Sequence, residues 1–525
     1  MNLKINSSTI KYFYLFGILM LMFGLMFSFF FVSISVAWLL FTWLLEGNFK
    51  EKFKDISKDS SIVVFISIFF IYLLGMLWTK NLKFGFSDLL IKTSIFAIPI
   101  VIKSNFWSDR KIFLTISYIF LIFVFLKSIQ YLIFWIFDVE NTQSIFYPQM
   151  SHILFSVIVN IALVFSLFLI KIFKNIWIKI LLIFFIIWST AVIIYIQSLT
   201  GILILQIFLI IMIIYSFISK QNIILSFSFL LFSLTIITLF VKIAVKEYNM
   251  CFNIEKINLE QLPKQTVNGN YYLHDTTEKW IEDGRYVFLY LCDDELRKQW
   301  NKKSEIDFDK GLDKNGFSIK YTLYRYMTSK GLAKDSLGFE QMTELDIKNV
   351  EKGNTNYRFT KKFSFSGWFN KIFWQLYNYK TTKNPNDQSI SQRIEYILTS
   401  KYIFLGNWIL GVGTGDVRDS FNYYFEKNKS KLKMQNRKYV HNQILTFLVT
   451  FGIFLGSFCI FALFFSYFKN KKYRELLPTL FFVAFLMYCF ADNPFDRTQS
   501  TIFTVFFYSL LILNKNLNYD KPKIT

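Results

Sequence analysis

A glycine-rich turn and a histidine beside a long apolar stretch are the features of this sequence with the residue types for chemistry. The segment GVGTGDV covers residues 411–417, and His441 opens the segment HNQILTFLVTFGIFLG at 441–456. An imidazole titrates near neutral pH, so at this boundary it can move a proton between a lipid-borne and a water-soluble substrate. Nearby cations such as Arg437 favour the neutral, basic imidazole. A capping or interfacial histidine is the alternative, as it is for His152.

Arg393 is the candidate for gripping an anion. It lies in SQRIEY, at the start of an amphipathic segment that we expect to form a surface helix over 390–410. A guanidinium can hold a phosphate through two parallel hydrogen bonds. A surface ion pair with Glu395 explains the same residue without a ligand.

The three glycines of GVGTGD permit two interpretations. Glycine tolerates positive φ and close backbone approach, so exposed amides of Gly411, Gly413 and Gly415 can surround an anion. A tight turn that links two packed helices needs the same residues.

Two short loops carry further polar candidates. In QSLTG (197–201), Ser198 and Thr200 suit either a tight turn or a ligand contact. In ADNPFDRTQS (491–500), the acidic and basic side chains either order a site or pair with each other. Asp88 and Lys92 are four residues apart inside an apolar stretch and can pair on one helix face.

Composition places these residues in a membrane protein. Hydrophobic residues make up 54% of the 525-residue chain, and Phe alone accounts for 65 positions. A helix needs roughly 20 apolar residues to cross a bilayer. The sequence predicts twelve such spans, at 12–28, 31–46, 61–78, 86–103, 112–137, 150–172, 176–196, 198–218, 223–242, 442–468, 475–490 and 499–514. The first two abut, so one bent helix is an alternative there.

The positive charge follows the membrane topology. The net charge is +22, but most of the excess lies in loops on one side of the predicted spans, while the short loops opposite carry only Lys80, Lys83 and Arg497. Cytoplasmic loops are the positive ones, so both termini are expected in the cytoplasm. This distribution argues against a nucleic-acid partner.

The predicted fold is an all-α polytopic membrane protein with one large outer loop. We expect an N-terminal bundle of about nine helices (1–242), a mainly helical loop domain (243–440), three C-terminal helices (441–514) and a cytoplasmic tail (515–525). Cys251 and Cys292 fall in the loop domain, as a disulfide or as two free thiols. No Cys or His spacing is typical of a metal site.

Together these motifs resemble the O-antigen ligase and polymerase superfamily. The resemblance rests on SQRIEYILTS, then GVGTGD, then HNQ and an apolar run ending in FGIFLG. The block from QWNKKSEIDFD through TLYRYMTSKGLAKD to DIKNVEKG, at 299–353, is similar to the version found in Bacteroidetes-type bacteria. The resemblance implies an inner-membrane glycosyltransferase with about twelve helices and one large periplasmic loop. Such enzymes move a glycan from an undecaprenyl-pyrophosphate carrier to an acceptor hydroxyl, with neither cofactor nor metal.

The resemblance also implies roles for individual residues. His441 matches the family's essential loop histidine and Arg393 its loop arginine. The matches to its glycine turn and last outer loop are Gly411, Gly413, Gly415, Asp416, Asp492 and Gln499. One position departs: Leu199 stands where the family usually has an arginine. Substitutes for that cation are Arg437, Lys401 or Arg325.

The hypothesis is therefore an inverting glycan ligase whose acceptor is of the lipid A-core type. A repeat-unit polymerase and a protein O-oligosaccharyltransferase share the donor and stay open as alternatives. A transporter or flippase is the alternative from a different class, and an inactive assembly partner would explain Leu199.

Overall fold

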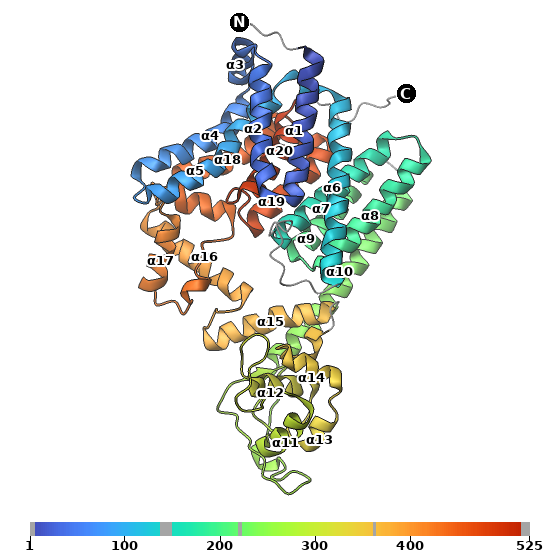
Figure 1. Ribbon diagram of the computed structural model, residues 1–525, viewed down its shortest axis with the longest axis vertical. Helices are drawn as coiled ribbons and strands as arrows, with labels where there is room; N and C mark the ends of the chain where they lie inside the picture. Colours follow the sequence, from blue (N-terminus) through green and yellow to red (C-terminus); the bar gives the residue numbers. More distant parts are fainter. Residues whose placement is uncertain (1–5, 137–149, 219–222, 361–363, 516–525) are drawn as a thin grey trace. The chain divides into compact units, whose positions relative to one another are not determined.

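The structure of this chain is a computed structural model that describes residues 6–136, 150–218, 223–360 and 364–515. Within these residues the fold is mostly helical, and the strands form a single two-stranded hairpin. The chain divides into two compact units, residues 1–230 with 392–525 and residues 231–391 (Figure 1). The predicted tail at 515–525 lies outside the described residues beyond Lys515.

Long apolar helices build the first unit. Its helices before the second unit are α1 (Ser7–Phe27), α2 (Phe29–Leu45), α3 (Phe49–Lys58), α4 (Ser60–Gly75), α5 (Leu82–Ile102), α6 (Arg110–Ile136), α7 (His152–Ile172), α8 (Ile176–Ile196) and α9 (Leu199–Ile218). After the second unit come α17 (Val417–Lys427), α18 (Gln443–Lys469), α19 (Leu476–Ala491) and α20 (Thr498–Tyr508). Two helices, α10 (Ile223–Phe252) and α16 (Ser389–Gly406), cross the boundary between the units.

Helix α7 lies at the centre of the first unit. It is apolar on nearly every face, and it is the most buried of the long apolar helices. A helix that is hydrophobic all round needs partners on all sides, and α6, α8, α9 and α19 pack around it. The core therefore sits among helices from both ends of the chain.

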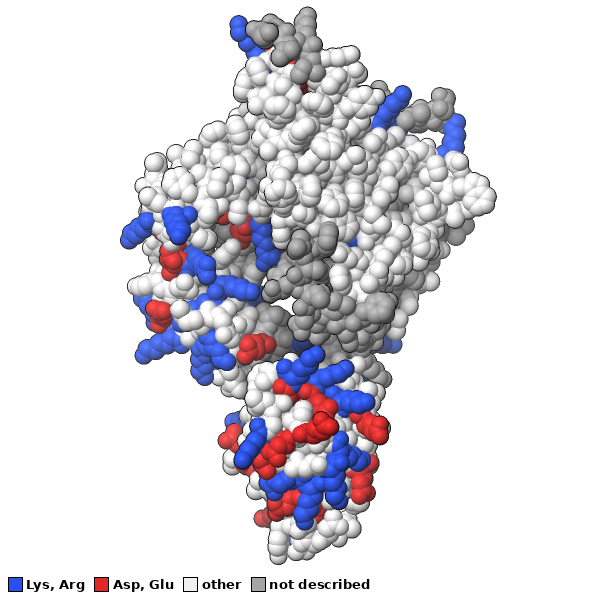
Figure 2. All heavy atoms as spheres, in the orientation of Figure 1, with Lys and Arg blue, Asp and Glu red and all other residues white. Residues whose placement is uncertain are grey.

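Eight helices of the described residues are long and apolar enough to cross a membrane. A ninth candidate is α2 with α3, which are bent by 114° at their junction, and Leu476–Ala491 and Thr498–Leu513 are shorter apolar helices. All twelve predicted ranges coincide with helices, but twelve crossings remain a prediction. In Figure 2 the upper part of the first unit is mostly free of charged atoms, which gather at its lower left, over α16 and α17. The architecture is that of a multi-pass membrane protein.

The first two predicted spans form a helical hairpin rather than one bent helix. The helix breaks at Ser28, whose backbone is extended, and α2 folds back along α1. The indole of Trp38 donates to the carbonyl of Phe13 at 2.9 Å. A Cβ on Gly24 would lie 2.5 Å from the backbone nitrogen of Val32, so the hairpin needs glycine at its closest approach.

The predicted loop domain, 243–440, is divided between the two units, and its role as an outer loop remains a prediction. Residues 392–440 belong to the first unit, because α16, α17 and the stretch before α18 share a core with α18 itself. Tyr396, Phe421, Phe425 and Val449 are buried in that core. The sequence pattern missed this packing because the segment is as rich in polar residues as the loop before it.

The second unit is a small domain with a compact core of its own. It contains β1 (Ile281–Glu282), β2 (Arg285–Tyr286), α11 (Asp293–Lys303), α12 (Ile319–Lys330), α13 (Ser336–Glu340), α14 (Glu344–Glu351) and α15 (Phe365–Thr382). Trp300, Leu323 and Phe339 are completely buried between its helices. Its surface intermingles both signs of charge (Figure 2). Cys251 and Cys292 are buried and are free thiols, so they do not form the disulfide that was one of two expectations.

Candidate functional site

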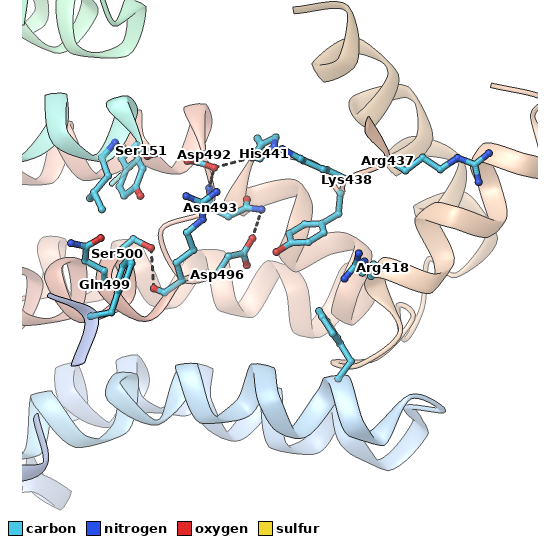
Figure 3. A pocket seen from close by; sticks show the side chains of 16 residues that line it. Ser151, Arg418, Arg437, Lys438, His441, Asp492, Asn493, Asp496, Gln499 and Ser500 are labelled. Carbon is cyan, nitrogen blue, oxygen red and sulfur yellow. Dashed lines mark hydrogen bonds and ion pairs between the residues drawn. The ribbon is translucent and has the colours of Figure 1, made fainter. Parts of the chain in front are cut away.

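A cavity of about 250 Å³ in the first unit is lined mostly by polar and charged residues. Three late segments supply most of them: the start of α17, the stretch before α18, and the connection from α19 to α20 (Figure 3). The charged residues and the histidine of its lining are Arg418, Arg437, Lys438, His441, Asp492, Asp496 and Arg497.

A capped helix start positions His441 at this cavity. Asn442 is the N-cap of α18, and its side-chain oxygen accepts the N–H of Leu445 at 3.0 Å. The amide nitrogen of Asn442 donates to the carbonyl of Phe490 at 3.2 Å. These two bonds fix the residue that follows His441, and His441 Nδ1 lies 3.0 Å from Asp492 Oδ1. Figure 3 shows the two side chains pointing toward each other.

The electrostatics around Asp492 define the state of this pair. Burial raises the pKa of the Asp492 carboxyl, but the hydrogen bond and charge of His441, the backbone N–H of Asn493 and the charge of Arg497 outweigh it, and the pKa lies below its usual value. When His441 has lost one of its two ring protons, the ionised Asp492 still accepts a hydrogen bond, so we assign the remaining proton of the neutral imidazole to Nδ1. Nε2 then carries the free lone pair and can act as a base.

Asn493 ties the loop after α19 to the segment before α18. Its amide nitrogen donates to the carbonyl of Val440 at 2.7 Å and to Asp496 Oδ2 at 2.6 Å. Its amide oxygen accepts from the hydroxyl of Thr446 at 3.1 Å. The His441–Asp492 pair thus rests on a loop whose polar groups are bonded on both sides.

Asp496 reaches a buried charge pair on α5. Lys92 is 1% exposed, hydrogen-bonds to Asp88, and places its ammonium nitrogen 3.9 Å from Asp496 Oδ1. Burial raises the pKa of Asp496 to about 6, opposed by the charge of Lys92 and aided by that of Asp88. Asp496 in turn is the main cause of a raised pKa at the Tyr439 hydroxyl. The pairing of Asp496 with Arg497, one of two expectations, does not occur.

Three cations at the cavity are available to a ligand. Arg418, Lys438 and Arg497 are exposed, and within the described residues their side chains make no hydrogen bond or ion pair. Arg437 differs, because its guanidinium donates to Glu426 at 2.9 Å and to the carbonyl of Leu432 at 3.3 Å. In Figure 3 the Arg437 side chain points away from the His441–Asp492 pair.

Arg393 lies beside the site without lining the cavity. Its guanidinium donates to the carbonyl of Ala491 at 3.1 Å, at the end of α19 and one residue before Asp492. Three residues that the sequence separates by up to 99 positions, Arg393, His441 and Asp492, therefore meet at one loop.

The backbone N–H groups of the glycine turn form hydrogen bonds with the surrounding protein. Its backbone N–H groups donate as follows: Val412 to the carbonyl of Val449 (3.0 Å), Gly413 to the carbonyl of Thr450 (2.9 Å), Gly415 to the Thr79 hydroxyl (3.1 Å). Asp416 accepts the N–H groups of Lys80 (2.8 Å) and Asn81 (2.7 Å). These groups therefore join the turn to α18 and to the connection between α4 and α5.

Close packing explains why glycines occupy this turn. Gly411 has a φ of +69°, and a Cβ there would lie 2.3 Å from the backbone of Thr450. At the facing position, Gly452 has a φ of +69° inside α18 and lies against the carbonyl of Ile409. The turn is thus built for backbone-to-backbone contact.

The remaining predicted residues lie in several places. Gln499 lines the cavity, where its amide nitrogen donates to the carbonyl of Leu25 at 2.5 Å. Ser198 is buried against the hydroxyl of Ser156 at 3.0 Å, and neither it nor Thr200 lines the cavity. Lys401 is exposed on α16 away from the lining. Arg325 belongs to the second unit, where it pairs with Glu282 at 2.9 Å.

Sequence reasoning did not single out Arg418 or Asn493, nor the Lys92 contact with Asp496. Arg418 lies three residues after Gly415, the last glycine of the turn, and that spacing was a usable signal. The Lys92–Asp496 contact joins residues some 400 positions apart, and no local pattern reports it.

Within the described residues, no group of three or more His, Cys, Asp or Glu side chains is arranged to hold a metal ion. No protein-family model matches this sequence, and no curated protein matches it either. The geometry of the cavity therefore carries the functional argument.

Proposed function

We propose that this protein is a membrane glycosyltransferase that moves a glycan from a polyprenyl-diphosphate carrier to an acceptor hydroxyl. One observation carries the proposal: the Asp492–His441 pair lines the same cavity as three cations whose side chains make no hydrogen bond or ion pair within the described residues. A base next to unpaired positive charge suits a reaction in which a hydroxyl loses a proton while a diphosphate departs.

In the proposed mechanism His441 is the general base. Asp492 holds the imidazole through Nδ1, and Nε2 takes the proton of the acceptor hydroxyl. The hydroxyl oxygen forms a bond to the anomeric carbon while the bond from that carbon to the diphosphate oxygen breaks. The leaving diphosphate keeps the electron pair, and Asp492 stabilises the imidazolium that results. A single direct displacement inverts the anomeric configuration.

Arg418, Lys438 and Arg497 are proposed to hold the diphosphate. Among the residues that the structure describes, none forms a hydrogen bond or ion pair with these side chains, so binding an anion breaks no ion pair there. Negative charge builds up on the diphosphate as it leaves. Positive charge fixed there therefore stabilises the transition state more than the ground state. This assignment transfers the phosphate-binding role from Arg393, which we propose instead positions the Asp492 loop through Ala491.

The acceptor and the cellular setting come from the sequence hypothesis. A lipid A-core type acceptor makes the protein a ligase of the inner membrane with its site at the periplasmic face. A growing glycan would make it a polymerase, and a protein hydroxyl an oligosaccharyltransferase.

A transporter is the competing class, and the buried Asp88–Lys92–Asp496 cluster is the observation in its favour. Intramembrane charges often mark ion pathways. The two classes differ in products: transfer forms a new glycosidic bond and frees the carrier, while transport changes neither.

Cells whose only copy carries His441→Ala test the proposal. The expected result is carrier-linked glycan that accumulates while the acceptor stays bare, with His274→Gln behaving as wild type at equal protein level. Long glycans on the carrier indicate a ligase, and single repeats a polymerase. Normal acceptor glycosylation in the His441→Ala strain would contradict the proposal.

A further inference from the structure

The second unit contains a cavity of about 500 Å³ that has no part in the chemistry proposed above. Its lining combines aromatic rings with carboxylates, and the residues that matter are Trp280, Phe288 and Tyr321 together with Asp275, Glu278 and Asp293. We name the three rings the aromatic platform.

Local structure brings the platform together from two elements. Trp280 and Phe288 flank the β1–β2 hairpin, where the N–H of Val287 donates to the carbonyl of Trp280 at 2.9 Å. The N–H of Asp275 donates to the carbonyl of Phe288 at 2.8 Å, and both residues line the cavity. Tyr321 comes from the first turn of α12.

The rings form a continuous apolar surface. The centroids of Trp280 and Phe288 lie 5.6 Å apart, as do those of Trp280 and Tyr321. Trp280 is 44% exposed and Tyr321 43%. Leaving two large aromatic side chains half exposed to solvent forgoes part of the hydrophobic free energy that their burial would give, so folding alone does not account for the arrangement.

The polar groups around the platform are mostly acceptors. Glu278 has no side-chain partner within the described residues. Asp275 accepts from the N–H and hydroxyl of Thr277, at 2.7 and 2.6 Å, and a carboxylate has lone pairs left for more donors. Asp293 is bonded to Lys320 and Tyr324, so the one cation of the lining is already paired.

This combination selects among ligand classes. An anion finds no free cation here and two carboxylates. A quaternary ammonium ion needs rings that enclose it. These three rings instead contact one another directly, at interplanar angles of 44°, 59° and 84°, and they share the lining with the ammonium group of Lys320. A sugar ring offers an apolar C–H face and a rim of hydroxyl donors, which match an aromatic surface bordered by carboxylates.

We infer that the platform of Trp280, Phe288 and Tyr321, bordered by Asp275 and Glu278, is a binding site for a neutral saccharide. Pyranose C–H faces stack on Trp280 and Tyr321, and sugar hydroxyls donate to the two carboxylates. Acidic sugars are excluded by charge repulsion. The inference does not rest on the transfer chemistry proposed for the first unit, because its readout is binding.

Saturation-transfer NMR on the full-length protein tests this inference. The protein is placed in phosphatidylglycerol nanodiscs, since glycoside detergents and choline headgroups would compete. The probes are chitotetraose, maltotetraose, tetragalacturonate and tetramethylammonium. We expect transfer to the ring C–H protons of at least one neutral tetrasaccharide and none to tetragalacturonate.

Three variants localise the binding. Trp280→Ala weakens the apparent affinity by about tenfold, Trp280→Phe keeps a ring and most of the binding, and Tyr271→Ala, an exposed aromatic outside the cavity, changes nothing. An equal melting temperature for Trp280→Phe and wild type shows that the unit remains folded.

Several results would overturn the inference. Absence of transfer to both neutral tetrasaccharides does so, as does binding that Trp280→Ala leaves intact. Binding of tetramethylammonium alone, lost in Trp280→Ala, would make the rings a cation site instead.

Discussion

The two units differ in whether their charged side chains are paired. In the second unit, buried carboxylates have dedicated partners: Glu282 is bonded to Arg325 and Asn356, and Glu247 to Arg358. At the cavity of the first unit, Asp492 and Asp496 are also partnered, but in the described part of the chain the side chains of Arg418 and Arg497 make no hydrogen bond or ion pair. Both regions contain the same residue types.

The difference separates structural charge from functional charge. A buried ion pair whose members satisfy each other has no capacity left for a ligand, and its loss is felt as instability. An open cation beside a base contributes little to stability and can bind an anion. The comparison would fail if substitution of an open cation in the first unit lowered stability, or if substitution of a buried ion pair in the second unit left stability unchanged.

The largest effect is expected for Asp492→Asn. An amide cannot stabilise the imidazolium and no longer fixes the proton on Nδ1, so the transfer rate should fall by about 10³-fold with an unchanged melting temperature. Steady-state kinetics with purified protein measure this. A loss below threefold would mean that Asp492 does not act through His441.

Arg325→Met should instead lower the stability of the second unit. It leaves Glu282, which is fully buried, without its ion pair, and we expect a loss of about 3 kcal/mol in the stability of the second unit. Limited proteolysis between 231 and 391 reports that loss. The double variant Arg325→Met with Glu282→Gln should recover part of it, and failure to recover would contradict the explanation by an orphaned charge.

Arg497→Gln and Arg418→Gln sharpen the distinction inside the cavity. Each should raise the KM for the lipid-diphosphate donor by about tenfold and leave the KM for the acceptor unchanged. Arg437→Gln is the matched control, because that guanidinium is already paired with Glu426. Equal effects of all three would show that pairing in the free protein does not predict ligand binding.

The smallest effect concerns pH and the second unit. Burial lowers the pKa of Lys334 to about 7, although Asp335 opposes the shift. Above pH 7 the folded state releases a proton that the unfolded state holds up to its ordinary value near 10.5, so stability rises with pH in that window. Between pH 7 and 8 the gain is about 1 kcal/mol, and Lys334→Met should abolish that part of the slope in thermal melts. An identical slope in the variant would contradict a buried neutral lysine.

The sequence predicted local features well, because they depend on local patterns. Apolar runs located the helices of the first unit. The loop histidine, Asp492 and Arg393 were all singled out, and they meet at one loop.

The sequence failed where the answer depended on distant partners. Nothing local shows that residues 392–440 pack with the first unit, or that the amides of the glycine turn are bonded to α18. The free cations were equally hidden, since Arg418 and Arg437 differ only in whether a partner such as Glu426 lies within reach.

The most direct test of the central claim is transfer by the purified protein in nanodiscs. A polyprenyl-diphosphate glycan and a hydroxyl acceptor are supplied, and released polyprenyl diphosphate is measured together with glycosylated acceptor. The account predicts equal amounts of both from the wild type, a loss of at least a hundredfold in His441→Ala, and little change in His274→Gln. Equal product formation by His441→Ala and wild type would contradict it.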